Sequence, residues 1–131
     1  NDSFARAKVL QWMSFESDYV QSTAGSLRYW TLTGKIPQRP AALVESKRQG
    51  ALKAFAALDR ELAQRRFAVG DEYTIADIAL FAYTHVARDA DLPLGDYRHI
   101  TTWIERIRDQ PRFLDKVYPY SIDPYSTREL P

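Results

Sequence analysis

From Val69 to Phe81 the chain has the sequence VGDEYTIADIALF, which contains a start signal for an α-helix. Thr74 and Asp77 are three residues apart, the spacing of a capping box. In this motif the hydroxyl accepts a hydrogen bond from the Asp77 amide, and the carboxylate accepts one from the Thr74 amide. We therefore predict a helix that begins at Ile75. Thr74 and Asp77 are assigned to its N-cap, a structural role rather than a catalytic one.

The predicted helix continues to Ala87 and is apolar around most of its circumference. Tyr73 and Ile78 have the spacing of a hydrophobic staple, which would fix the angle at which the chain enters the helix. Only three residues interrupt the apolar run: Asp77, Thr84 and His85. A helix of this kind is typical of the centre of a domain, and it is too short to span a membrane. We expect it to lie buried among other helices.

Two longer helices are predicted before it. The first runs from about Phe4 to about Gln21, with Asp2 or Ser3 as its cap, and its broad apolar face fits either one wide core contact or burial on two sides. The segment 24–26 can bend or restart this helix. The second runs from about Pro40 to about Arg66, because a proline fits the first helical position. Its apolar residues from Val44 to Leu62 repeat at three- and four-residue spacing, which predicts one apolar face. Gly50 inside it marks either a close helix crossing or a tolerated defect.

The C-terminal third predicts shorter elements. An amphipathic helix is expected from about Tyr97 to about Asp109. A last short helix is expected to begin at Pro111, with three apolar side chains directed inward: Phe113, Leu114 and Val117. Pro119 and Pro124 then leave 118–131 as an extended tail. No segment alternates as a strand would, so we predict an all-α bundle of about five to six helices around a central buried helix.

Composition and charge restrict the possible functions. The 131 residues, 45% of them hydrophobic, suffice for one domain with its own core. A net charge of +1 provides no strong field for nucleic acid or an anionic membrane, and acidic residues interleave with the basic ones of the second helix, which favours a solvated face. We expect neither a nucleic-acid nor a membrane partner.

Few catalytic or metal-binding patterns are present. The absence of cysteine excludes a disulfide scaffold, a thiolate metal site and a cysteine nucleophile. The two histidines, His85 and His99, have no cluster of further ligands around them, so we expect no metal site. A serine–histidine–aspartate triad stays open because its members need not be adjacent, although no nucleophile-elbow motif supports one.

The run FAVGDEYTIADI from Phe67 to Ile78 resembles the capping-box signature in the C-terminal helical domain of cytosolic glutathione transferases. Four further segments are similar to the bacterial members of that family: QWMSFE at 11–16, LRYW at 27–30, YTHVA at 83–87 and WIERI at 103–107. The resemblance extends from about Phe4 to Val117. It implies that residues 1–131 form the helical domain of a larger protein, and the start at Asn1 rather than methionine agrees with this expectation.

The resemblance also implies a function for the intact protein. In the family an N-terminal thioredoxin-like domain supplies most of the glutathione site and the catalytic residue, and no pattern for that domain precedes Phe4. The helical domain would provide a wall of the electrophile pocket and part of a homodimer interface in a cytoplasmic protein. We expect glutathione to be the co-substrate of the intact protein, no cofactor in this chain, and no transferase activity from this domain alone.

Phe15 and Tyr19 are the candidate substrate-binding residues, since their i,i+4 spacing places both on one helix face where they could line an apolar pocket. Core or interface packing is the alternative. Glu16 and Asp18 lie on the same helix, and in some family members an acidic residue here approaches the amino group of glutathione; a solvated helix face is the alternative. A rival hypothesis for the whole chain is a non-catalytic protein-binding module, as found in translation-factor and synthetase assemblies.

Overall fold

The computed structural model describes residues 2–118, and every regular element in that range is helical. The elements are α1 (Ser3–Phe15), the π-helix η1 (Glu16–Gly25), α2 (Ser26–Leu32), the 3₁₀-helix η2 (Ile36–Gln38), α3 (Ala41–Leu62), α4 (Ile75–Thr84), the 3₁₀-helix η3 (Ala87–Ala90) and α5 (Arg98–Arg108). The predicted all-α class is confirmed. Within the described range, none of the helices has the length and apolar character needed to cross a membrane.

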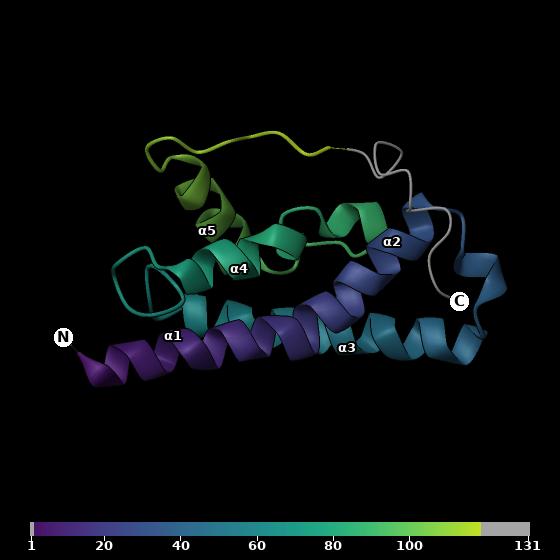
Figure 1. Cartoon of the computed structure of the whole chain (residues 1–131), viewed down its shortest axis with the longest axis horizontal. Helices are drawn as coiled ribbons and strands as arrows, with labels where there is room; N and C mark the ends of the chain where they lie inside the picture. The colour runs from purple at the N-terminus through teal and green to yellow at the C-terminus, as the bar shows by residue number, and fades with distance from the viewer. Residues whose placement is uncertain (1, 119–131) are drawn as a thin grey trace.

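The first three elements form one bent helical rod from Ser3 to Leu32 (Figure 1). Asp2 caps it, since its Oδ1 accepts from the amides of Phe4 and Ala5 at 3.0 and 3.2 Å. At the segment 24–26 the wider π-helical turns of η1 end at Gly25 and α2 begins at Ser26, which agrees with the prediction that this segment bends or restarts the helix. Hydroxyl groups on η1 and α2 donate back to carbonyls four residues earlier, and such bonds compete with the regular α-helical ladder. The donors are Ser22, Thr23 and Ser26.

Two glycines allow η1 to approach its neighbours closely. A Cβ atom added at Gly50 on α3 would lie 2.9 Å from Cγ2 of Thr23, closer than real Cβ contacts come. A Cβ atom at Gly25 would lie 3.1 Å from the ring of Tyr83 on α4. Gly50 thus marks a close helix crossing, one of the two explanations that the sequence left open.

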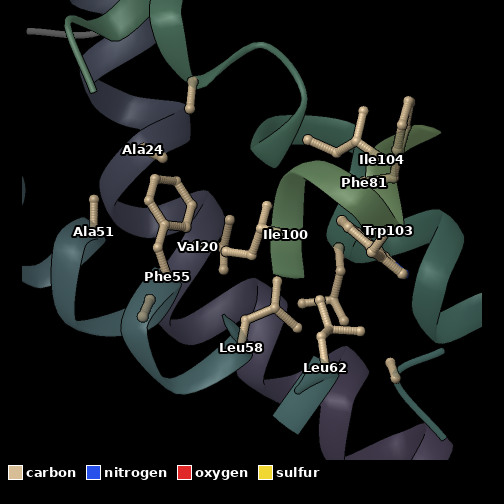
Figure 2. Close-up of a cluster of buried hydrophobic side chains, with 14 of the residues drawn as sticks. Val20, Ala24, Ala51, Phe55, Leu58, Leu62, Phe81, Ile100, Trp103 and Ile104 are labelled. Atoms are coloured by element: carbon tan, nitrogen blue, oxygen red, sulfur yellow. The ribbon is translucent and has the colours of Figure 1, made fainter. Parts of the chain in front are cut away.

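The core lies where η1, α3, α4 and α5 meet. Figure 2 shows side chains from η1, α3 and α5 directed toward one another in this region. Val20, Phe55, Leu58, Ile100 and Trp103 are fully buried. The predicted apolar face of α3 is the buried face, although α3 ends at Leu62 and does not reach 66.

Helix α4 lies between the rod and α5 but is not buried all round (Figure 1). Leu80 and Thr84 are 0% exposed, whereas Ile75 and Ile78 are 57% and 53% exposed. The expected helix to position 87 ends at Thr84 and resumes only as the 3₁₀ turn η3. The predicted staple does not bury Ile78, and Tyr73 packs instead against Phe67, with ring centroids 5.7 Å apart. Helix α4 is apolar around most of its circumference, but the described part of the chain leaves one of its faces uncovered.

The short helix expected from Pro111 does not form. Positions 111 and 112 make a turn, and the chain then continues to Tyr118 without regular structure. Arg112 has φ of 65°, a left-handed conformation that ends any helix. Phe113 does pack inward, 5.4 Å from the Phe81 ring, but Leu114 is 87% and Val117 51% exposed, so the inward prediction is wrong for both. Positions 119–131 of the expected tail lie outside the described residues.

Candidate functional site

The N-terminus of α4 contains both hydrogen bonds of a capping box. The Asp77 Oδ2 accepts from the Thr74 amide at 3.0 Å and from the Thr74 hydroxyl at 3.1 Å. The same hydroxyl accepts from the Ala76 amide at 3.3 Å. Thr74 and Asp77 therefore satisfy amides that a helix N-terminus otherwise leaves without partners.

The second oxygen of Asp77 binds two groups that sequence reasoning missed. Oδ1 accepts from the Trp103 indole Nε1 at 2.9 Å and from the Ala68 amide at 2.8 Å. Asp77 and Trp103 are both 0% exposed. The carboxylate thus joins α4 to α5 and to the loop before α4, and it has no exposed atom with which to meet a substrate. A buried indole N–H requires an acceptor, and this requirement was the available signal for Trp103.

The predicted substrate-binding residues lie in one row of aromatic rings along the rod. Phe15 ends α1 and Tyr19 lies in η1, with ring centroids 5.2 Å apart. Trp12 extends the row, its ring packing edge-on against Phe15 at 5.0 Å. Tyr19 is 56% exposed and Phe15 is half-buried. We call Trp12, Phe15 and Tyr19 the aromatic row.

A recess of about 140 Å³ lies beside two members of this row. Trp12 and Phe15 form its aromatic side, and Glu61 of α3 contributes from across the groove. Binding sites for small molecules generally measure about 300–1,000 Å³. The recess is therefore too small to hold a whole substrate, and the row presents part of a wall rather than a closed pocket.

Glu16 is half-buried at the junction of α1 and η1, next in sequence to Phe15. Burial raises the pKa of the Glu16 carboxyl group above its ordinary value. No group in residues 2–118 makes a hydrogen bond or ion pair with this side chain. Asp18 is exposed, as expected for a solvated helix face.

The two histidines lie in separate places. His85 follows α4, stacks on Phe81 with ring centroids 4.0 Å apart, and has Nδ1 2.6 Å from the Phe81 carbonyl oxygen. Burial is the main cause that lowers the pKa of His85. His99 is on α5, where its amide donates to Asp59 at 2.9 Å. In the described part of the chain, no group of three or more potential ligands is placed to hold a metal ion.

Basic side chains on α3 connect it to other elements. Lys47 donates to the Ser22 carbonyl at 2.6 Å, and Arg48 donates to the Asp91 carbonyl at 2.8 Å. Both lysine and arginine here are half-buried, so part of the face expected to be solvated takes part in packing.

Comparison with known proteins identifies the family. Residues 13–111 match the model described as glutathione S-transferase, C-terminal domain. The chain belongs to this family. The match includes the rod from Met13 onward, the capping box of α4 and all of α5. The family domain therefore contains most of the elements described above.

Relatives share the helical domain over part of their length. A GST-like protein of Streptococcus mutans is 32% identical over 117 residues, 81% of this chain and 43% of the relative. Elongation factor 1-gamma-A of Xenopus laevis is 30% identical over 114 residues, 82% of this chain and 25% of the relative. The crystal structure of a glutathione S-transferase from Pseudomonas fluorescens superposes with a TM-score of 0.83 at 31% identity, covering 87% of this chain and 57% of the other. The chain thus spans about half the length, or less, of these proteins.

Proposed function

We propose that residues 1–131 act as the C-terminal domain of a bacterial glutathione S-transferase, where they form a wall of the electrophile pocket and part of a homodimer interface. Glutathione would be the co-substrate, bound mainly by an N-terminal thioredoxin-like domain that also supplies the catalytic residue. The reaction would be attack of the glutathione thiolate on an electrophilic carbon. The intact protein would work in the cytoplasm.

The aromatic row is the observation that carries this proposal. Tyr19 is 56% exposed although it packs against Phe15, and the adjoining recess is only about 140 Å³. An exposed row of rings beside an incomplete recess matches a pocket whose other walls belong to a second domain, and aromatic faces suit apolar electrophiles.

Exposed apolar side chains on α1 and α4 support the proposal that another domain or subunit covers this part of the surface. Phe4 and Leu10 on α1 are 69% and 54% exposed, and Ile75 and Ile78 on α4 are 57% and 53% exposed. These two helices pack against each other. Large apolar side chains left exposed on two adjoining helices are typical of surfaces that another domain or subunit covers.

The test measures glutathione conjugation of 1-chloro-2,4-dinitrobenzene by the intact protein. Tyr19→Ala and Phe15→Ala should each raise the KM for the electrophile, reducing kcat/KM about tenfold, the equivalent of about 1.4 kcal/mol of aromatic contact. The KM for glutathione should stay unchanged. Tyr118→Ala is the matched control, because Tyr118 is 63% exposed and is not part of the row. Equal effects of Tyr19→Ala and Tyr118→Ala would contradict the assignment.

The second candidate is a protein-binding module without catalysis. Its support is the similarity to elongation factor 1-gamma-A over 82% of this chain. A glutathione-affinity column separates the two functions when loaded with the intact protein. Retention with elution by free glutathione favours the transferase, whereas no retention together with a stable complex of defined stoichiometry favours the module.

A further inference from the structure

A second, larger cavity lies at the opposite end of α4 from the capping box. Its volume is about 520 Å³, within the range of small-molecule sites. Its walls come from the two residues that follow α4, from η3, from the loop before α5, from α5 and from the segment that follows α5. None of the aromatic row lines it, so the cavity is separate from the surface assigned to the electrophile.

His85 lines this cavity, and the hydrogen-bonding role of each of its ring nitrogens is fixed. Because Nδ1 lies 2.6 Å from the Phe81 carbonyl oxygen, Nδ1 carries the hydrogen and donates it. In the neutral ring the other nitrogen, Nε2, is then an acceptor. Stacking on Phe81 with an interplanar angle of 10° fixes the plane of the ring. Burial lowers the pKa of His85, which favours the neutral form at pH 7.

Two of the charges that line the cavity have no hydrogen-bond or ion-pair partner among the described residues. Asp89 is paired with Arg28 at 3.0 Å, and Glu105 is paired with Arg108 at 2.8 Å. Arg88 and Asp115 line the same cavity, and neither makes a hydrogen bond or ion pair with any group in residues 2–118. With respect to residues 2–118, the cavity therefore offers a cation and an anion without partners, and a neutral acceptor.

Apolar side chains complete the lining. Ile104 of α5 is 6% exposed, and Leu94 packs against the hydrophobic core. Val117 contributes from the segment after α5. A ligand that satisfies all of these groups must have a negative group, a positive group with N–H donors, and an apolar body.

We propose that this cavity binds a small zwitterion, namely an α-amino acid with an apolar side chain. Arg88 binds the carboxylate, because a guanidinium forms charge-assisted and often bidentate bonds with carboxylates. Asp115 and the Nε2 atom of His85 accept hydrogen bonds from the ammonium group. Ile104, Leu94 and Val117 contact the side chain.

Isothermal titration of the intact protein with L-phenylalanine tests the proposal. Saturable binding is expected, and it should persist when S-methylglutathione is present in excess, so it does not depend on the proposed transferase site. Two truncated probes should bind at least tenfold more weakly: 3-phenylpropionate, which lacks the ammonium group, and phenethylamine, which lacks the carboxylate. Absence of saturable binding, or equal affinity for all three probes, would overturn the proposal.

Variants assign the charges. Arg88→Gln should weaken the binding of L-phenylalanine about tenfold or more while leaving the affinity for phenethylamine unchanged. Asp115→Asn should weaken the binding of L-phenylalanine to a similar degree while leaving the affinity for 3-phenylpropionate unchanged. Arg88 and Asp115 are exposed and have no partner in the described part of the chain, so neither change should lower the melting temperature by more than a degree or two. Arg60→Gln and Asp71→Asn are the matched controls, since both residues are exposed and lie outside the cavity. Control variants that weaken binding as much as Arg88→Gln and Asp115→Asn would refute the assignment.

Discussion

Removing the hydrogen bond between Trp103 and Asp77 should destabilise this domain strongly. Its donor, the indole Nε1, lies 2.9 Å from the carboxylate oxygen, and both side chains are 0% exposed. Trp103→Phe deletes this donor and reduces the volume of a fully buried ring. A lost hydrogen bond to a charged group costs about 1.5–3 kcal/mol, and the cavity adds about 1 kcal/mol. We expect a loss of about 3 kcal/mol in the free energy of unfolding.

The measurement is urea unfolding followed by circular dichroism. Trp12→Phe is the matched control, because Trp12 is only half-buried and none of its atoms hydrogen-bonds to Asp77. It should cost less than about 1 kcal/mol. A double-mutant cycle with Asp77→Asn measures the part of this bond that depends on the charge of the carboxylate: the double variant should be more stable than the sum of the two single losses predicts, by about 1 kcal/mol or more. Additive losses, or equal losses for the two tryptophans, would refute the reasoning.

Three further changes probe the cap, the helix crossing and the buried histidine. Thr74→Ala should lower the free energy of unfolding by about 1 kcal/mol, with Thr74→Ser close to wild type, and should leave ligand affinity of the intact protein nearly unchanged; a lost affinity without a lost stability would contradict this. Gly50→Ala should lower the melting temperature of the protein despite the better helix propensity of alanine, because the new Cβ atom would lie 2.9 Å from Thr23 Cγ2. In a Thr23→Ser background, which removes Cγ2, the same change should raise the melting temperature. An identical effect in both backgrounds would argue against the close crossing. Burial lowers the pKa of His85 in the native protein, so as the pH falls through the ordinary value of 6.5 the unfolded chain takes up a proton at His85 before the folded chain does, and the free energy of unfolding should fall. Urea unfolding at pH 7.5 and 5.5 should show a smaller fall in His85→Phe than in the wild type. An equal fall in both proteins would assign the pH dependence to other groups.

Local signals in the sequence predicted the elements well. The start of α4 at Ile75 follows from two side chains three residues apart, and the buried face of α3 follows from its own periodicity. Such features depend on interactions within one helix, so a single segment contains the information. The same reasoning could not supply Trp103 as the partner of Asp77, because 26 residues separate them and only the packing of α5 on the core brings them together.

Where the prediction was wrong, apolar composition was taken for burial. The spacing of Phe113, Leu114 and Val117 suggested an inward face, yet Arg112 adopts a positive φ and the helix that would create this face does not form. On α4 the apolar circumference is real, but Ile75 and Ile78 remain exposed. A sequence can indicate that a face avoids water without indicating which partner covers it.

The π-helical turns of η1 connect the core to the aromatic row. Val20 and Ala24 from these turns are 0% and 1% exposed in the core, while Tyr19 in the same turns is 56% exposed. Thr23 takes part on both sides, since its hydroxyl donates to the Tyr19 carbonyl and its methyl group lies against Gly50 of α3. The close crossing with α3 therefore fixes the backbone that carries Tyr19. In this arrangement the position of the exposed Tyr19 ring depends on Gly50, more than thirty residues away along the chain. The stability of the helix crossing is therefore linked to the shape of the surface on which the proposed function rests.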